Sequence, residues 1–371
     1  MIRRLSRRNL IEAAGATAFA PSFRAAAAPP PSQWPVVEGP DTPHINMGGG
    51  RDEAGMRRVK QLGVDYVTGG GIGGPLPWKE ADIRAAIERS KAAGLTLFNA
   101  MIAGFNNAIY GRPGRDEEID KIRQSIQAAG KAGLPVIEYN FYAHRAMEGY
   151  FEETGRAGIG HTGFDYEKMK DLPPLPQEGA HSLDEMWNNA TYFLKAVVPV
   201  AQESGVRLAL HPNDPPAPIS RGSGQIMGTV AGWKKYVSIV DSPSNGITFD
   251  CGVTREMGED PVEVCRYFAS RDRINHMHYR NVRVIKPYER YTEVAIDEGQ
   301  VDMFAVMKEL VRQKYRRTIE PEHPRAFDYD REYSKLTTGG PIRGYPGGGG
   351  FAGVMFNIAY TRAMMQAALE S

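Results

Sequence analysis

Several features are scarce in this chain of 371 residues, and each scarcity excludes a class of protein. Its 45 basic residues are balanced by 44 acidic ones, and a net charge of +1 gives no attraction to nucleic acid or to an acidic membrane surface. No run of 18 apolar residues occurs, so we expect no membrane-spanning helix in the mature chain. Only two cysteines are present, Cys251 and Cys265. An exported protein could join them, but nothing in the pattern recommends a bond, and we expect two buried free thiols.

The first 28 residues differ in composition from everything that follows. Residues 6–11, SRRNLI, are a twin-arginine pattern, and a weakly apolar stretch rich in alanine and glycine continues to four alanines at 25–28. We interpret residues 1–28 as a twin-arginine signal peptide and residues 29–42 as a proline-rich linker; the alternative is a basic N-terminus with an alanine-rich helix. The signal predicts recognition by the twin-arginine export machinery and a periplasmic or otherwise exported location. That pathway carries folded proteins, so it suits a protein that receives a metal before export.

From residue 43 the chain alternates short apolar runs with amphipathic stretches, which is the pattern of a parallel sheet wrapped by helices. Strands are predicted at 44–47, 65–68, 96–101, 135–141, 207–211, 246–251, 274–279 and 318–320. Helices are predicted at 52–62, 80–93, 116–132, 182–204, 230–240, 261–270, 301–313 and 351–369. We therefore expect residues 43–371 to form one (β/α)8 TIM barrel, with long irregular loops near 146–181 and 286–300 that cover the active site.

Four of the predicted strands end in a side chain that can bind a metal ion. These side chains are His211, Asp250 or Cys251, His278, and Glu320 or Glu322. Alternate residues of a strand face one side, and the C-terminal ends of barrel strands meet, so four of these groups are expected to converge. Two imidazoles and two carboxylates favour Mn²⁺, Mg²⁺, Fe²⁺ or Zn²⁺, whereas a thiolate from Cys251 would favour a softer ion. The sequence therefore predicts a divalent-metal enzyme.

Several short motifs carry a resemblance to a known family. They are YNF at 139–141, HPNDPP at 211–216, NGITF at 245–249, HYRNV at 278–282, DMFAVMK at 302–308, PEH at 321–323 and GY at 344–345. Together they resemble the mannonate dehydratase family, whose members are xylose-isomerase-like barrels, and the resemblance extends from about residue 43 to residue 367. The proline-rich histidine motif and the HYRNV motif are specific in combination, although either alone is weak.

The resemblance implies a lyase of carbohydrate metabolism that uses Mn²⁺ or a similar ion to dehydrate D-mannonate to 2-keto-3-deoxy-D-gluconate. The family's metal ligands are His, Cys, His and Asp, which fall on His211, Asp250, His278 and Glu322. Two positions depart from the family, because Asp250 replaces the cysteine and Glu322 replaces the aspartate. Both replacements can bind a metal, but the site becomes richer in oxygen. The substrate is therefore left open as D-mannonate or a related sugar acid.

The resemblance also implies two catalytic residues, His323 directly after the last ligand and Tyr345 before the final helix. In the elimination, one would remove the C2 proton and the other would protonate the departing C3 hydroxyl, and which does which is left open. Asn140, Arg145 and Arg280 are candidates for contacts with the hydroxyls or the carboxylate of the substrate, with a salt bridge as the alternative role of Arg280.

Two other functions remain as alternatives. A metal-dependent isomerase or epimerase of the same barrel superfamily would use carboxylate ligands such as those at positions 250 and 322. A non-catalytic sugar-binding protein would need the pocket but no acid and base. Catabolism of sugar acids is expected in the cytoplasm, and this conflict with an exported location keeps the substrate open. Formation of a homo-oligomer is left open as well.

Overall fold

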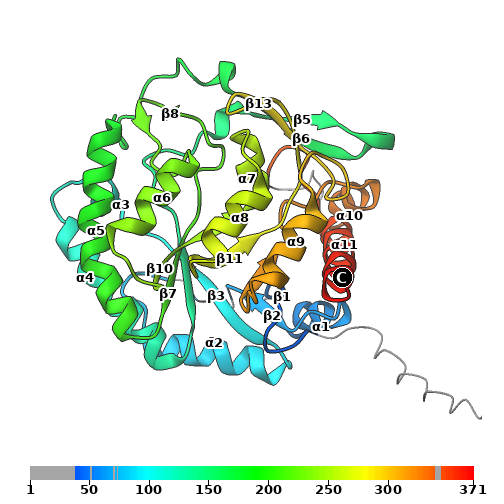
Figure 1. The fold of residues 1–371 in the computed structure, drawn as a ribbon, viewed down its shortest axis with the longest axis horizontal. Coiled ribbons are helices and arrows are strands. Elements are labelled where there is room, and N and C mark those ends of the chain that lie inside the picture. The colour runs from blue at the N-terminus through cyan, green and yellow to red at the C-terminus, as the bar shows by residue number, and fades with distance from the viewer. Residues whose placement is uncertain (1–37, 51, 70–71, 73, 339–343) are drawn as a thin grey trace, which may run out of the picture. The chain divides into compact units, whose positions relative to one another are not determined.

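The computed structural model describes residues 38–50, 52–69, 72, 74–338 and 344–371, and Figure 1 shows their arrangement. The predicted signal peptide and residues 29–37 of the predicted linker lie outside the described residues. Within the described part of the chain, no helix combines the length and the apolar character that crossing a membrane requires.

Eight parallel strands close into a barrel in which each strand pairs with the barrel strands before and after it in the chain. They are β1 (His44–Gly48), β2 (Tyr66–Thr68), β3 (Thr96–Ile102), β4 (Val136–Tyr139), β7 (Arg207–Leu210), β10 (Asn245–Asp250), β11 (Ile274–His278) and β14 (Thr318–Glu320). All eight predicted strands are present, and the ends differ by two residues at most. The prediction of a (β/α)8 barrel is therefore confirmed.

The predicted helices are present as well. They are α1 (Glu53–Gln61), α2 (Glu80–Ala92), α4 (Arg115–Ala132), α5 (Leu183–Glu203), α6 (Val230–Ile239), α8 (Pro261–Ala269), α9 (Met303–Arg312) and α11 (Phe351–Leu369). Local chemistry sets their ends: the side chains of Asp52, Thr229 and Asp260 accept hydrogen bonds from first-turn amides of α1, α6 and α8. Gly133 takes a φ of 90° where α4 ends, a conformation that glycine adopts without steric cost.

Several further helices were not predicted. They are α3 (Asn106–Tyr110), α7 (Cys251–Glu256), α10 (Asp328–Thr338) and the 3-10 turns η1 (Met147–Gly149), η2 (Arg156–Gly158) and η3 (Tyr166–Lys168). Among them, α7 matters most for the site, because it begins directly after β10. The carboxylate of Asp250 accepts a hydrogen bond from the amide of Val253 and so caps this helix.

The two segments predicted as irregular loops contain most of a second sheet. β5 (Tyr150–Thr154), β6 (Gly160–Asp165), β12 (Val282–Lys286) and β13 (Arg290–Glu293) form an antiparallel sheet in the order β12-β13-β6-β5, which we call the accessory sheet (upper edge of Figure 1). The irregular structure was a wrong prediction, because β13 pairs with β6 from a distant part of the chain, and local patterns do not show such a partner. A two-stranded sheet of β8 (Ile219–Ser220) and β9 (Ser223–Gly224) lies in the segment after β7.

The protein has two buried regions of different character, one between the barrel and its helices and one inside the barrel. Between the barrel and its helices the core is apolar and aromatic, as where Trp233 packs against Phe249 and Phe268. Inside the barrel, in contrast, buried polar side chains such as Asn99 and Thr248 accompany the apolar ones. A polar interior can hold a buried charge by hydrogen bonding, which an apolar interior cannot do.

Candidate metal centre

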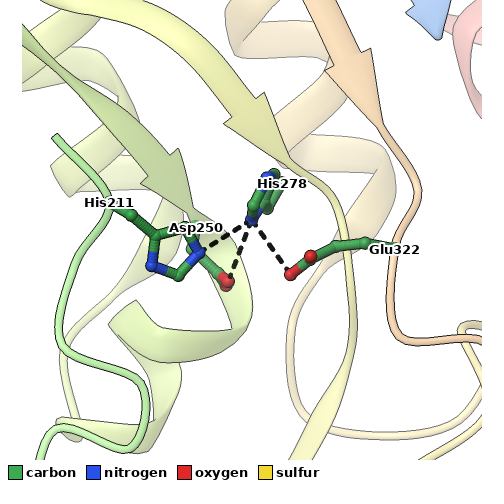
Figure 2. Close-up of side chains that lie close together, drawn as sticks. All are labelled: His211, Asp250, His278 and Glu322. Carbon is green, nitrogen blue, oxygen red and sulfur yellow. Dashed lines mark hydrogen bonds and ion pairs between the residues drawn. The ribbon is translucent and has the colours of Figure 1, made fainter. Parts of the chain in front are cut away.

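Four strand ends place their side chains around one point, as Figure 2 shows. His211 follows β7, Asp250 ends β10, His278 ends β11, and Glu322 lies just beyond β14. One ligand atom from each of the four lies within 4.8 Å of the others. The strand register explains the convergence, because Asp250 lies opposite His278 on the neighbouring strand. We call these four side chains the ion cluster.

The donor atoms of the ion cluster point at one another. Nδ1 of His278 lies 3.0 Å from Oε1 of Glu322, 3.1 Å from Nε2 of His211 and 4.0 Å from Oδ2 of Asp250. Oε1 of Glu322 is buried, yet it makes no hydrogen bond with any described residue. A divalent cation satisfies a converging set of two imidazole nitrogens and two carboxylate oxygens, so these residues fit a metal site.

The titratable groups of the ion cluster shift one another's pKa values. Burial opposes a charged imidazole, but the carboxylates of Glu322 and Glu138 outweigh it and raise the pKa of His278 to about 10. Burial likewise opposes the ionised form of Glu322, yet the charges of His278 and His323 hold its pKa well below the usual range. Burial and then the neighbouring His278 lower the pKa of His211. A proton on His278 therefore offsets part of the negative charge of this cluster in the metal-free protein, at the place where a cation would bind.

Glu138 on β4 is a functional candidate that the sequence analysis missed. Its carboxylate is 3% exposed and lies 3.5 Å from Nε2 of His278, on the side of the ring away from the ion cluster. Thr248 donates a hydrogen bond of 2.7 Å to one of its oxygens, and Asn99 donates one of 3.1 Å to the other. A carboxylate behind a metal-binding histidine orients the ring and strengthens it as a ligand. The signal in the sequence was a lone acidic residue inside the buried strand V-I-E-Y.

The structure separates the two glutamates that the sequence left as alternatives. Glu322 belongs to the ion cluster, while Glu320 faces the barrel interior. There it accepts hydrogen bonds from Asn46 and Thr68, and it lies 3.6 Å from Nε2 of His276. Glu320 is therefore committed to contacts across the barrel.

A second group of titratable residues adjoins the ion cluster, and we call His323, Glu293 and Asp214 the His323 cluster. Nδ1 of His323 lies 2.8 Å from Oε2 of Glu293, while Nε2 lies 3.5 Å from Oε1 of Glu322 and 3.9 Å from Oδ2 of Asp214. The ring centroids of His323 and Tyr345 are 5.0 Å apart, so both predicted catalytic residues lie at one place. Asp214 and Glu293 were missed, because the contacts that give them a role come from the loops and from β13.

The comparisons with known proteins agree with this geometry. Residues 178–344 match the family model of D-mannonate dehydratase (UxuA). The mannonate dehydratase of Thermotoga petrophila is 30% identical over 313 residues, which are 74% of this chain and 86% of that protein. The chain belongs to the mannonate dehydratase family. The mannonate dehydratase of Streptococcus equi subsp. zooepidemicus is 31% identical over 243 residues, which are 58% of this chain and 66% of that protein, just under two thirds of its length.

Solved structures support the fold of this mannonate dehydratase family member. The crystal structure of mannonate dehydratase from Streptococcus suis serotype 2 superposes with a TM-score of 0.75 at 24% identity, covering 89% of this chain and 95% of that one. L-ribulose 3-epimerase superposes with a TM-score of 0.54 at 14% identity, covering 89% and 96%. At these identities the likeness concerns the fold alone, a closed barrel of eight parallel strands wrapped by helices.

The sequence left Asp250 and Cys251 as alternative metal ligands. The structure brings Asp250 into the ion cluster and leaves Cys251 outside it. Cys251 begins α7 with its Sγ turned toward backbone carbonyls, 3.3 Å from that of Arg280 and 3.6 Å from that of His278. Burial, and then the adjacent Asp250, raises the pKa of the thiol. Cys251 and Cys265 are both free and buried. The thiol is therefore a neutral packing group.

Arg280 of the HYRNV motif, a predicted substrate contact, is committed to carboxylates of the protein. Its guanidinium is 2% exposed, and it donates hydrogen bonds of 2.9 Å to Asp250 and 2.7 Å to Glu256. Gly252 leaves room for it, since a Cβ there would lie 2.8 Å from the arginine side chain. These contacts fix the orientation of Asp250 and agree with the salt-bridge role of Arg280. Its Nη2 makes no hydrogen bond with any described residue, so the contact with substrate stays a prediction.

The other predicted substrate contacts lie in the segment that follows β4. Arg145 donates hydrogen bonds to the backbone carbonyl and the carboxylate of Asp214, and its guanidinium lies 5.0 Å from the ring centroid of Tyr345. Asn140 follows β4, and its amide contacts Sδ of Met101 at 3.9 Å. Arg145 is thus tied to the His323 cluster, and Asn140 is half-buried beside the strand ends.

Proposed function

We propose that this protein is a metal-dependent hydro-lyase that dehydrates D-mannonate, or a related sugar acid, to a 2-keto-3-deoxy product. The observation that carries the proposal is the convergence of His211, Asp250, His278 and Glu322 at the barrel strand ends, with His323 beside them. Membership of the mannonate dehydratase family supports the same reaction.

The donor set suits a divalent ion with a preference for oxygen ligands. Mn²⁺ is the first candidate, and Mg²⁺, Fe²⁺ and Zn²⁺ are the others. His211, Asp250, His278 and Glu322 would hold it. When bound, such an ion supplies a Lewis acid that stabilises the negative charge developing on the substrate as its C2 proton leaves.

The reaction breaks the C2–H and C3–OH bonds, so that water leaves and the resulting enol rearranges to the 2-keto product. His323 and Tyr345 are the groups that move the protons. Burial, with a further contribution from Asp214, raises the pKa of Tyr345, so its phenol stays protonated at neutral pH and suits donation to the departing hydroxyl. His323 takes the C2 proton through Nε2, the nitrogen nearer to the ion cluster.

The test is turnover of D-mannonate by the purified protein loaded with Mn²⁺, with detection of the 2-keto-3-deoxy product. Metal analysis of the same protein and of Glu322→Ala accompanies it. We expect stoichiometric ion and product formation in the wild type, and loss of both in the variant. Absence of any divalent ion from the wild type after loading would remove the proposed chemistry.

One observation favours an isomerase or epimerase as the second candidate. Asp250 and Glu322 give the ion cluster two carboxylates, where the family pattern has one cysteine and one aspartate. Turnover of a neutral sugar, with D-mannonate left unchanged, would select this candidate. A binding protein without catalysis would bind sugar equally well after His323→Asn.

We also propose that residues 1–28 direct export through the twin-arginine machinery. The support is the SRRNLI pattern, the apolar stretch and the four alanines in the sequence. A fusion of residues 1–42 to a reporter that works only after export should lose its signal when Arg7 and Arg8 are both changed to lysine. An unchanged signal would contradict export by this route.

A further inference from the structure

We propose that Glu293, on β13 of the accessory sheet, is a positioning residue that fixes the ring of His323 so that Nε2 faces the ion cluster. The inference rests on the proposed function, because it assigns a task to the residue that supports the proposed base. Glu293 is not one of the four residues whose donor atoms form the ion cluster.

The contact between the two side chains is short and shielded from water. Oε2 of Glu293 lies 2.8 Å from Nδ1 of His323, and the side chains are 1% and 10% exposed. Burial opposes ionisation of Glu293, but His323 and Arg280 outweigh it and lower its pKa, so the carboxylate is ionised and accepts a hydrogen bond from the N–H of Nδ1. With Nδ1 committed in this way, Nε2 is the nitrogen that can exchange a proton.

Arg325 donates hydrogen bonds to both Glu293 and His323. Its Nη2 donates a hydrogen bond of 3.1 Å to the same oxygen of Glu293, and its Nε donates one of 2.8 Å to the backbone carbonyl of His323. Its Nη1 donates one of 2.6 Å to Thr162, which lies opposite Glu293 in the pairing of β6 with β13. The backbone and the ring of His323 are therefore attached to the accessory sheet at separate points.

The backbone of His323 needs this support. Its φ is +47°, a left-handed conformation that side chains other than glycine rarely adopt. Such conformations persist where surrounding contacts over-determine them, and they concentrate at functional sites. The bonds from Arg325 and Glu293 supply those contacts, and Nε2 of His323 lies 3.5 Å from Oε1 of Glu322 in the adjoining ion cluster.

The consequence is a carboxylate–imidazole pair with defined roles. A carboxylate bonded to Nδ1 fixes the tautomer and the orientation of the ring, and it stabilises the imidazolium that forms when Nε2 takes a proton. The accessory sheet thereby contributes to the site as the support of the base.

The test is Glu293→Gln, which preserves the size of the side chain but removes the charge. Histidine-selective ¹⁵N NMR of the whole protein, with the His323 signals assigned from a His323→Asn variant, reports which ring nitrogen carries the proton. We expect a protonated Nδ1 in the wild type and a shifted tautomer or ring signal in Glu293→Gln. We also expect kcat to fall by about 100-fold while KM and the content of divalent ion stay close to wild type.

The matched control is Glu153→Gln. Glu153 belongs to β5 of the same sheet and accepts hydrogen bonds from Arg290 and Thr292, so its change disturbs the sheet without touching His323. We expect its His323 signals and its kcat to resemble the wild type.

Two results would overturn the inference. One is an unprotonated Nδ1 of His323 in the wild-type protein, a measurement that needs no variant to fold. The other is a Glu293→Gln protein whose His323 signals and kcat match the wild type. Since the NMR measurement requires no turnover, a wild type without dehydratase activity would reject the proposed reaction and leave the positioning of His323 to be decided on its own.

Discussion

The ion cluster and the His323 cluster lie side by side, and both combine imidazoles with carboxylates. In the His323 cluster each carboxylate already has donors: Asp214 accepts bonds from Tyr150 and Arg145, and Glu293 accepts bonds from His323 and Arg325. In the ion cluster Asp250 likewise accepts bonds from Val253 and Arg280, and Oε1 of Glu322, like Oε1 of Glu293, makes no hydrogen bond among the described residues. What the ion cluster has in addition is a pair of imidazole nitrogens that face each other.

The two clusters differ in how well they suit a metal ion. Arginine side chains occupy the surroundings of Asp214 and Glu293, and Arg280 adds a further positive charge 3.4 Å from Asp214. A metal ion there would meet like charge, although three ligand types are close enough to hold one. Arg280 also donates a hydrogen bond of 2.9 Å to Asp250 of the ion cluster, but only that cluster adds two facing imidazole nitrogens that a cation can bind. We therefore place metal binding in the ion cluster and proton transfer in the His323 cluster.

The largest expected effect separates these two assignments. His323→Asn should lower kcat by roughly 10²- to 10⁴-fold, the range typical of a lost general acid or base. The content of divalent ion should remain that of the wild type, because the four ligands are untouched. Metal analysis beside steady-state kinetics checks both. A variant that loses its ion together with its activity would show that the two clusters are one unit.

A smaller effect is expected behind the ion cluster. Glu138→Gln keeps an acceptor for Thr248 but removes the charge beside Nε2 of His278, and affinity for Mn²⁺ should fall by about 10- to 100-fold. Competition with a chelator measures it. Glu309→Gln is the matched control, since Glu309 is also a buried glutamate, 4% exposed, whose partners lie on α8 and α9. Equal affinities in the two variants would remove the role given to Glu138.

The comparison also shows how much of the site could be predicted. His211, Asp250 and His278 stand at the ends of strands with a clear local pattern, and parallel strands bring such ends together whatever the details. The His323 cluster depends instead on Asp214, in the segment after β7, and on Glu293 of β13, a strand that is held by pairing with the distant β6. Sequence therefore identified His323 by resemblance to a family, but it could not identify Glu293, whose role exists only in the folded sheet.

Arg280 shows the same limit within a motif. The HYRNV sequence predicts a functional arginine, but only the adjacency of β11 to the start of α7 shows that Asp250 and Glu256 use its donors. The motif indicates that an arginine has a role at this position, but only the packing around it shows which side chains it contacts.

The charge balance of the ion cluster predicts how pH affects the metal-free protein. The pKa of His278 is raised from 6.5 to about 10 in the folded state, so its stabilising contribution is complete below pH 6.5 and is lost as pH rises toward 10. Tm should therefore fall by a few degrees across that window. With Mn²⁺ bound the decline should be smaller, because the ion replaces the proton. Thermal unfolding with and without a chelator checks this, and a metal-free Tm that rises with pH would contradict it.

The smallest effect is expected at Cys251, the residue beside the ligand. A serine there keeps a donor near the carbonyls of His278 and Arg280 but packs less volume, so stability should fall by about 1 kcal/mol with unchanged content of divalent ion. Cys265→Ser, at a buried thiol within α8, is the matched control. Loading both variants with Co²⁺ sharpens the comparison, because a thiolate ligand adds a charge-transfer band that carboxylates lack. Since burial keeps the thiol protonated, we expect no such band in the wild type, and a band lost only in Cys251→Ser would place sulfur in the ion cluster instead of Asp250.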